Sequence, residues 1–335
     1  IEALFHRPLE KRLQADSFTI VASRSGASFR ANIPPDISVC QDCFEELTDP
    51  ADRRFGYPFI NCTNCGPRFS IIETIPYDRP KTSMKDFAMC GDCSREYLDP
   101  MDRRFHAQPN GCPACGPAIS LHDSQGRPLN STDLVAAAIT AIIHNKVLAI
   151  RGLGGFHLCV NGCSTAAVET LRDRKNRPDK PLAIMVKDLL QAEKLCVLDD
   201  QEKHTLSSPQ HPIVLLKPRP DSPLAPNLAP EMSDIGLMLP YTPLHHLLFA
   251  QPDCPAALVM TSGNISGEPI CTSNDEALDR LAGIADLFVL HNRDIVTRVD
   301  DSVVKHVAGE IRAFRRARGY APEPLHISQK LPEFI

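Results

Sequence analysis

The chain has 335 residues, of which 43% are hydrophobic and 23% are charged, and this composition excludes global disorder. Its formal net charge of -5 disfavours bulk electrostatic attraction to nucleic acid or to an anionic membrane, so neither is expected as a partner. Thirteen cysteines, mostly in close pairs and without a secretory signal at the start of the sequence, predict metal ligation in a reducing cytoplasm.

Residues 1–36 contain no complete structural pattern. One short apolar run at 18–21 predicts a strand, and a single strand is too little to fold alone. The sequence also starts with Ile1 rather than Met, so we expect a fragment of a longer chain.

The strongest feature is an internal repeat with a period of fifty residues. Between residues 40–71 and 90–121, 15 of 32 aligned positions are identical. Each copy holds two Cys-x2-Cys pairs separated by eighteen residues, with an Asp-Arg-Arg-Phe segment between the pairs. Duplication of one structural unit explains this pattern.

Two Cys-x2-Cys turns can supply four thiolates to one tetrahedral ion. The simplest assignment is one structural zinc ion per copy, with no coordination position left for water; disulfides and iron–sulfur clusters are the alternatives. The predicted ligands are Cys40, Cys43, Cys62 and Cys65 in the first copy and Cys90, Cys93, Cys112 and Cys115 in the second.

The charge of this duplicated region argues against nucleic-acid binding. Residues 37–120 hold nine Lys and Arg against twelve Asp and Glu, and each zinc with four thiolates adds about two further negative charges. Such a surface repels phosphates. We therefore expect the Asp-Arg-Arg-Phe segments to brace each copy internally, with Arg paired to Asp and Phe in a small core.

A polar stretch at 121–130 predicts a domain boundary, after which strand and helix patterns alternate over about 190 residues. The alternation is interrupted in places, which predicts an α/β domain at 131–322 with a mixed, twisted sheet and flanking helices, preceded by the small duplicated cysteine domain at 37–120. Helices are expected at 131–145, 164–175, 188–195, 243–250 and 274–283, and strands at 147–150, 181–186, 213–216, 235–239, 257–261, 287–290 and, as a pair, within 302–316.

Five basic residues occur within nine positions at 172–180, where a predicted helix ends and a buried strand begins. Pro178 prevents the helix from continuing. Solvated cations at a helix C-terminus, favoured by the helix dipole, are one explanation. The other is an anion site, in which Lys supplies a point charge and Arg a planar fork for phosphate or carboxylate.

A second candidate segment, residues 258–269, runs from an apolar strand into hydroxyl, amide and glycine residues. Donors with little side-chain bulk at a strand end can approach a ligand closely, although an ordinary turn has the same pattern. The sequence contains neither a P-loop motif nor Gly-x-Gly-x-x-Gly, and it contains no Gly-x-Ser-x-Gly elbow.

Together, Lys175-x-Arg177-Pro with Lys180-Pro-Leu, and the distant Thr-Ser-Gly-Asn at 261–264, resemble the YrdC-type domain. That group includes the threonylcarbamoyl-adenylate synthases, which make an acyl adenylate from ATP. With the twin cysteine quartets added, the sequence resembles more narrowly the HypF family, the carbamoyltransferases of nickel–iron hydrogenase maturation. Further segments that carry this likeness are residues 105–109, 239–246 and 315–320.

The likeness to HypF covers residues 18–325 and implies that residues 1–36 are the tail of an acylphosphatase-like domain and a linker. It also implies that most of that domain and a C-terminal carbamoyl-transfer domain are missing from this chain. The implied reaction is attack of carbamate, derived from carbamoyl phosphate, on the α-phosphate of ATP with Mg²⁺. The implied product is carbamoyl adenylate, whose carbamoyl group goes to the C-terminal cysteine of the partner protein HypE.

The same likeness assigns roles to individual residues. Lys175 and Arg177 would hold carboxylate and phosphate oxygens, and Ser262 and Asn264 would hydrogen-bond the nucleotide phosphate and the acyl group. These four are the implied catalytic residues. The implied nucleotide-binding set consists of Lys175, Arg177, Lys180, Thr261, Ser262, Asn264, Arg315 and Arg316.

Two departures from the synthase pattern disfavour a pocket for a whole threonine. Met238 stands where the synthases have an Arg, and residues 154–158 differ from their Thr-x-x-Val-Tyr-Gly-Leu segment. A smaller acyl group such as carbamoyl fits better. His157 is either a lining residue of that pocket or, like the other histidines considered, a packed bystander; those others are His106, His245 and His246. Cys159, Cys163, Cys196, Cys254 and Cys271 are expected to be ordinary buried thiols.

Two alternative functions stay open at this point. One is a threonylcarbamoyl-adenylate synthase acting for tRNA modification. The other is a zinc-dependent protein-docking module that catalyses no reaction by itself.

Overall fold

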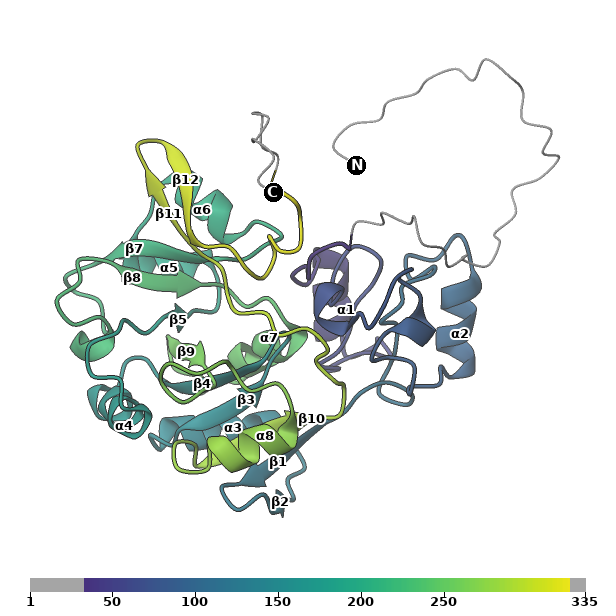
Figure 1. The fold of residues 1–335 in the computed structure, drawn as a ribbon, viewed down its shortest axis with the longest axis horizontal. Coiled ribbons are helices and arrows are strands. Elements are labelled where there is room, and N and C mark those ends of the chain that lie inside the picture. Colours follow the sequence, from purple (N-terminus) through teal and green to yellow (C-terminus); the bar gives the residue numbers. More distant parts are fainter. Residues whose placement is uncertain (1–32, 326–335) are drawn as a thin grey trace, which may run out of the picture.

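The computed structural model describes residues 33–325. The strand predicted at 18–21 and most of the predicted linker lie outside the described residues. Figure 1 shows a small cysteine-rich region, residues 33–118, beside one large sheet with helices packed against it. We call these parts the cysteine module and the α/β domain. No helix of the described part is both long enough and apolar enough to span a bilayer.

The cysteine module contains one short helix in each copy of the repeat, α1 (Gln41–Thr48) and α2 (Gly91–Leu98). Each helix begins directly after the first cysteine of its copy and ends before the Asp-Pro pair. A single 3-10 turn, η1 (Phe69–Ile71), ends the first copy, and a second, η2 (Arg79–Lys81), lies between the two copies. The apolar cluster around Leu47 is small, and Ile71 and Met84 add a few buried side chains outside it, so much of the module's order depends on polar contacts and on the cysteine centres.

The α/β domain is built on a twelve-stranded sheet with the order β12-β11-β7-β8-β5-β9-β4-β3-β10-β1-β2, and β6 pairs with β7 beside this path. Three neighbouring pairs are parallel and the others antiparallel, so the predicted mixed sheet is confirmed. The strands are β1 (Ile119–Asp123), β2 (Pro128–Leu129), β3 (Leu148–Arg151), β4 (Phe156–Asn161), β5 (Ile184–Met185), β6 (Cys196–Val197), β7 (Ile213–Pro218), β8 (Ile235–Met238), β9 (Leu258–Ser262), β10 (Leu287–His291), β11 (Val303–Val307) and β12 (Glu310–Arg315).

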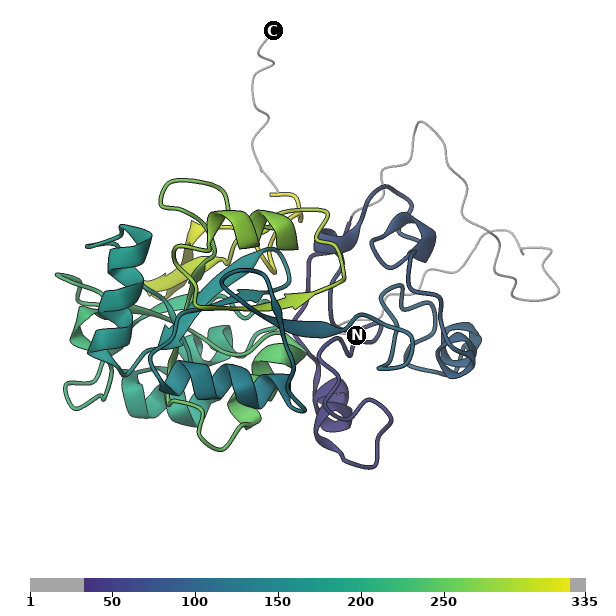
Figure 2. The ribbon, with the colours of Figure 1, turned by 90° about the horizontal axis from the view of Figure 1, so that it is seen from below.

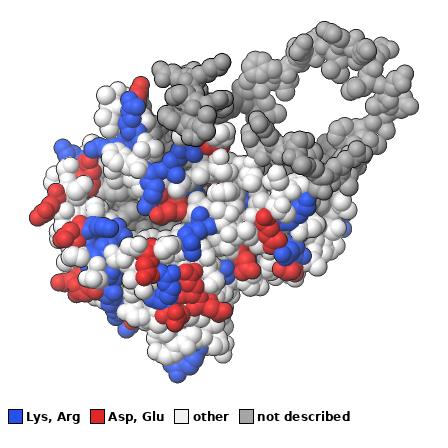
Figure 3. Space-filling model, viewed as in Figure 1, with Lys and Arg blue, Asp and Glu red and all other residues white. Residues whose placement is uncertain are grey.

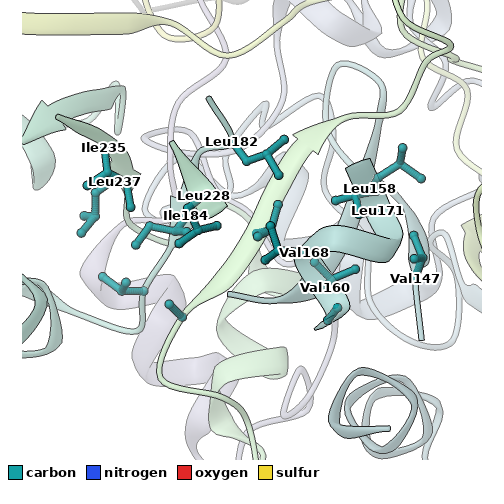
Figure 4. Close-up of a cluster of buried hydrophobic side chains, with 14 of the residues drawn as sticks. Val147, Leu158, Val160, Val168, Leu171, Leu182, Ile184, Leu228, Ile235 and Leu237 are labelled. Atoms are coloured by element: carbon teal, nitrogen blue, oxygen red, sulfur yellow. The ribbon is translucent and has the colours of Figure 1, made fainter. Parts of the chain in front are cut away.

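Helices cover both faces of the sheet and close two separate cores. One face packs against α3 (Leu134–Ile143) and α7 (Pro243–Ala250). The other face packs against α4 (Thr165–Lys175), α5 (Leu189–Leu195), α6 (Asp200–Leu206) and α8 (Asn274–Arg280). Figure 4 shows part of this second core, where Leu171 and Val168 of α4 lie against Leu158 and Val160 of β4. The central strands are therefore apolar on both faces.

The predicted boundary at 121–130 is wrong, because these residues form part of the sheet. β1 and β2 make a hairpin at the sheet edge, and β1 pairs with β10 along its whole length. Leu121 enters the core while its polar neighbours point outward. The polar side of this edge strand hides it in the sequence, since one buried residue in five leaves little periodic signal.

Several other elements differ from the predictions. Strand β4 was not predicted, although it lies between β3 and β9 in the middle of the sheet. Helix α6 was also missed, despite a capping box between Asp199 and Glu202 at its start. The strand expected at 181–186 is ordered as a strand only at Ile184–Met185, and the helix expected at 274–283 ends at Arg280.

Two glycines allow the loops at one end of the sheet to approach each other closely. A Cβ on Gly154 would lie 2.3 Å from the carbonyl oxygen of Val299, and one on Gly263 would lie 2.8 Å from that of Phe156. The amide of Gly263 donates to the same Phe156 oxygen at 2.6 Å. No side chain fits at either position, so both glycines hold the loops around the candidate site in place.

Candidate metal centres and cationic site

The structure brings each cysteine quartet together. In both sets the four sulfur atoms lie within 4.8 Å of one another. Neighbouring sulfurs are 3.6 Å apart for Cys40 and Cys62 and 3.7 Å apart for Cys112 and Cys115. Zn–S bonds of about 2.3 Å give a tetrahedron with edges of about 3.8 Å, whereas a disulfide needs about 2.05 Å. Both quartets therefore fit a structural zinc ion with four protein ligands.

The arginines of the Asp-Arg-Arg-Phe segments cross between the two copies. Arg54 of the first copy binds Glu96 of the second copy through both carboxylate oxygens and donates to the Gly111 carbonyl at 3.0 Å. Arg104 of the second copy binds Glu46 of the first copy in the same way. The expectation that each segment braces its own copy is therefore wrong.

The aspartates and phenylalanines of these segments also act differently from the prediction. Asp52 accepts the backbone N–H of Arg54 at 2.7 Å and leaves the guanidinium free to reach the other copy. Phe55 is 52% exposed rather than part of a core. The Asp52 carboxylate therefore stabilises the turn, and the arginine side chain is paired elsewhere.

The neighbouring arginines approach the opposite cysteine centres. Arg53 donates to the sulfur of Cys93 at 3.3 Å, and Arg103 donates to the sulfur of Cys43 at 3.2 Å. Burial raises the pKa of Glu96, but its ion pairs with the arginines outweigh burial and lower that pKa to about 2. Each copy therefore supplies positive charge beside the thiolates of the other.

In the α/β domain, the structure brings Lys175 to the Ser-x-Asn segment. Ser164 caps the start of α4 by accepting the Ala167 N–H, and Lys175 is the last residue of this helix. Its Nζ donates to the carbonyl of Ser262, and to the carbonyl and the side-chain oxygen of Asn264 at 3.0 and 2.8 Å. The two segments that sequence analysis singled out thus meet at one end of the sheet.

The environment of Lys175 combines burial with three oxygen acceptors. Only 2% of the residue is exposed, and burial, followed by the charge of Arg177, lowers the pKa of its ammonium group from 10.5 to about 7. The three acceptors match the three N–H bonds of an ammonium group. Lys175 is therefore poised to gain or lose a proton near neutral pH.

Arg177 and Arg315 lie beside this lysine, together with a carboxylate that sequence analysis missed. Burial lowers the pKa of Arg177, and the charges of Arg172 and Arg315 lower it further. Arg315 forms a 2.8 Å ion pair with Asp300. The charge of Asp300 opposes the lowering of the pKa at both Lys175 and Arg177.

The rest of the basic cluster has structural contacts. Arg172 is buried and donates to five carbonyl oxygens, including those of Arg177 and Leu228, which fixes the loop after α4. Arg174 forms an ion pair with Asp286. Lys180 is exposed and donates no side-chain hydrogen bond within residues 33–325. The cluster thus divides into residues that hold the loop and residues that face the site.

The remaining candidates lie at or beyond the edge of this site. Thr261 is buried on β9, directly before Ser262. Arg316 donates to the carbonyl of Glu323 at 2.6 Å, which directs it away from Lys175. Figure 3 shows a hollow in this face of the α/β domain, below the β11–β12 hairpin, with Lys and Arg side chains on its rim.

A buried chain of polar residues beside the site was not predicted. His157 lies opposite Ser262 across the β4–β9 pair, and its Nε2 is 2.9 Å from an Asp301 oxygen. The other Asp301 oxygen accepts from Arg318 at 2.8 Å, and the Arg318 guanidinium lies 3.3 Å from the ring centre of Tyr241. Burial raises the pKa of Asp301, but Arg318 and His157 outweigh it and hold that pKa well below its ordinary value.

His157 is therefore tied to a carboxylate, whereas the other three histidines pack on aromatic rings, as expected for bystanders. The ring partners are Tyr97 for His106, Tyr241 for His245 and Phe44 for His246. No spacing in the sequence links residues 157, 301 and 318, which lie on three separated segments. Of the five other cysteines, three are buried and two, Cys163 and Cys254, are half-buried.

Two family models match the chain. Residues 140–317 match the model of the Sua5, YciO and YrdC proteins, described as "Telomere recombination". Residues 39–72 and 89–122 each match the model described as "HypF finger". The second pair of matches coincides with the two copies of the repeat.

Curated relatives cover nearly all of this chain. The chain is 52% identical over 310 residues to the carbamoyltransferase HypF of Synechocystis sp., covering 92% of this chain and 40% of that protein. It is 46% identical over 343 residues to the carbamoyltransferase HypF2 of Cupriavidus necator, covering 97% of this chain and 42% of that protein. The chain therefore spans about two fifths of the length of the curated relatives it matches.

Two solved structures have the same fold over this region. The crystal structure of full-length HypF in a phosphate- and nucleotide-bound form is 51% identical with a TM-score of 0.85, covering 90% of this chain and 39% of that one. The crystal structure of T. kodakarensis HypF is 44% identical with a TM-score of 0.86, with the same coverage of both chains.

Proposed function

The chain belongs to the HypF family of carbamoyltransferases, and from this premise we propose that its α/β domain activates a carbamoyl group as carbamoyl adenylate. ATP with Mg²⁺ is the proposed co-substrate. The observation that carries this proposal is the junction of Lys175 with Ser262 and Asn264 at one end of the sheet, beside Arg177. The bound nucleotide named for the full-length HypF crystal structure supports it.

In the proposed reaction a carbamate oxygen attacks the α-phosphorus of ATP, the bond to the β-phosphate oxygen breaks, and pyrophosphate leaves. Negative charge builds up on phosphate oxygens during this step, and fixed cations stabilise it. Lys175 and Arg177 supply these cations. Ser262 and Asn264 supply neutral donors to the phosphate and the carbamoyl group, and Arg315, paired with Asp300, adds a further cation.

We further propose the division of the chain and the role of its metal centres. Residues 1–36 form the tail of an acylphosphatase-like domain with a linker, and residues 37–118 form a tandem zinc domain whose two ions are structural. The α/β domain then begins at the β1–β2 hairpin rather than at residue 131, because that hairpin pairs with β10.

The proposed partners follow from the family. Carbamoyl phosphate is the source of carbamate, and the C-terminal cysteine of HypE is the acceptor of the carbamoyl group. We propose a cytoplasmic location, where thiolates of the two quartets stay reduced. Lys180, Thr261 and Arg316 contribute less to the nucleotide site, since their side chains are exposed, packed on a strand or directed elsewhere.

Exchange of labelled pyrophosphate into ATP tests this function. The chain should catalyse exchange that depends on carbamoyl phosphate or on carbamate itself, and Lys175→Ala or Ser262→Ala should lower the rate at least about 100-fold. Lys217→Ala, at an exposed position on β7, is the matched control and should leave the rate unchanged.

Other outcomes favour the competing functions. Exchange that requires threonine and bicarbonate, with none from carbamate, would identify a threonylcarbamoyl-adenylate synthase. A folded, zinc-loaded chain that binds no ATP would be a docking module instead. Offering carbamate directly removes the dependence on an acylphosphatase domain.

A further inference from the structure

A small cavity lies where the α/β domain meets the cysteine module. β3 and β10 are parallel neighbours, so their carboxyl ends lie side by side, and Figure 2 shows β10 ending at this junction. Arg151 ends β3, His291 ends β10, and Arg293 follows two residues later. The cavity holds about 30 Å³. Its other walls come from the cysteine module, including Phe59 and Pro67.

Arg293 contributes a buried charge to this cavity. Only 6% of the residue is exposed, and its guanidinium has no hydrogen-bond acceptor and no ion-pair partner among residues 33–325. Its guanidinium carbon lies 5.0 Å from the centre of the Phe59 ring. An aromatic face attracts a cation, but it does not supply acceptors for the N–H groups of a guanidinium.

Arg151 adds a second buried cation, and only some of its N–H groups have a hydrogen-bond acceptor. Its Nη1 donates to the carbonyl of His291 at 2.6 Å and to Asn274 at 3.0 Å, while its buried Nε has no partner in the described part of the chain. The nearest carboxylate, Asp294, is 3.6 Å away and 83% exposed. A contact with so exposed a group neutralises little of a buried charge.

No negative charge lines the cavity to balance these two arginines. Its lining contains neither Asp nor Glu. His291 is neutral: its Nδ1 accepts the Arg293 backbone N–H, and its Nε2 faces the Gly152 carbonyl. The buried carboxylate of Asp36 lies outside the lining and forms no ion pair with Arg293. One of its oxygens accepts backbone and hydroxyl donors at 68–70, and the other has no partner in the described part of the chain. Its charge opposes the lowering of the Arg293 pKa without cancelling it.

Buried cations without a counter-charge are unfavourable, and burial accordingly lowers the pKa of Arg293 to about 10. We propose that this cavity binds one small monovalent anion, a halide or a one-carbon oxyanion such as formate or bicarbonate, between Arg151 and Arg293. A cavity of 30 Å³ accommodates about two water-sized spheres, which excludes a nucleotide. The site is separate from Lys175, and the inference does not depend on the proposed adenylate chemistry.

The anion would also fasten the two parts of the chain together. The arginines belong to the α/β domain, whereas Phe59 and Pro67 belong to the cysteine module, so the bound ion is enclosed only while the two parts are in contact. A ligand that binds only this closed arrangement stabilises it in proportion to its occupancy.

Bromide provides a direct probe. Crystals of the zinc-loaded chain grown with sodium bromide should show an anomalous peak between Arg151 and Arg293. In solution, sodium chloride, bromide or formate should raise the thermal unfolding midpoint by about 3 °C relative to sodium gluconate at equal ionic strength, at which screening is the same. A response to formate and bicarbonate but not to halides would identify an oxyanion site, and the reverse a halide site.

The variant Arg293→Met should abolish both the peak and the anion-dependent shift. Arg127→Met, which removes an exposed arginine paired with Asp123, is the matched control and should keep both. The absence of bromide from the cavity of the wild-type crystal, together with equal midpoints in all salts, would overturn the proposal. This test uses the wild-type chain, so it can refute the proposal even if Arg293→Met does not fold.

Discussion

The crossing of arginines between the two cysteine copies makes a directional prediction about zinc retention. Arg104 belongs to the second copy, yet it binds Glu46 on α1, the helix that carries Cys43 of the first copy. It also donates to the Asn61 carbonyl, next to Cys62, at 3.0 Å. Replacing Arg104 with Met should therefore loosen the first zinc centre rather than the centre of its own copy.

The magnitude follows from what the substitution leaves behind. Removing one partner of a buried ion pair costs about 3 to 5 kcal/mol. Glu46 keeps its second partner, Arg103, at 2.5 Å, and about a quarter of its side chain is exposed. We therefore expect a cost of about 2 kcal/mol, which makes opening of the first centre about 30-fold more frequent.

Thiol alkylation read by mass spectrometry resolves the two centres. In the zinc-loaded Arg104→Met variant, Cys40 and Cys62 should be alkylated about 30-fold faster than in the wild type, and the second quartet should keep its rate. Arg54→Met should do the reverse. Arg95→Met removes an exposed pair within one helix and serves as the control. Faster alkylation of the second quartet in Arg104→Met would refute the crossed arrangement.

Three further substitutions test the α/β domain. Because burial lowers the pKa of Lys175 to about 7 and bound phosphates would raise it, nucleotide binding above pH 7 should take up protons and weaken as pH rises. Lys175→Met should remove this uptake, seen by calorimetry in buffers of different ionisation enthalpy, and lower the affinity about 10- to 100-fold. Asp301→Asn should lower the free energy of unfolding by about 3 kcal/mol in denaturant titrations, because a buried guanidinium loses its carboxylate, whereas Glu310→Gln at an exposed position should change it by less than about 0.5 kcal/mol. Gly154→Ala should cost about 1 to 3 kcal/mol in the same assay because its Cβ meets a carbonyl oxygen, and Gly283→Ala, which meets nothing, should be nearly neutral.

The sequence was most informative where spacing alone determines geometry. Each Cys-x2-Cys pair specifies a turn, and two such turns place four sulfurs at the corners of a tetrahedron, as found in both copies. Helix starts were also predictable, because Ser164 and Thr242 accept backbone N–H groups at the first turns of α4 and α7. These signals act over a few residues, within which the chain has little freedom.

Contacts between distant segments left no comparable signal. Arg54 and Glu96 are 42 residues apart, and a closer aspartate looked like the natural partner. β4 was missed because its residues lie against both cores, and a short apolar run has no period to reveal it. Asp301 and His157 are 144 residues apart, so only the folded sheet brings them together.

The basic cluster at 172–180 shows why composition alone could not tell ligand-binding residues from residues that hold the fold. Arg172 and Lys175 lie one helical turn apart, carry the same charge and are both buried. Arg172 donates to five carbonyl oxygens of the loops that it holds, at 177–180 and 227–228. Lys175 instead donates to Ser262 and Asn264 at the end of β9, where the proposed nucleotide site lies. The two residues differ in which backbone carbonyls lie within reach of their side chains, and the fold determines this.

A continuous set of contacts joins the first cysteine centre to the cationic site. Val39, next to Cys40, donates its N–H to the carbonyl of Tyr241 at 3.3 Å. The Tyr241 ring lies under Arg318, and Arg318 holds Asp301, which adjoins Asp300 at the site. Contact alone does not establish energetic coupling. It does show that the cysteine module touches the buried chain of Tyr241, Arg318 and Asp301, which lies next to the site. If the two parts are coupled, removing zinc with a chelator should weaken nucleotide binding, and unchanged binding would leave the contacts as packing alone.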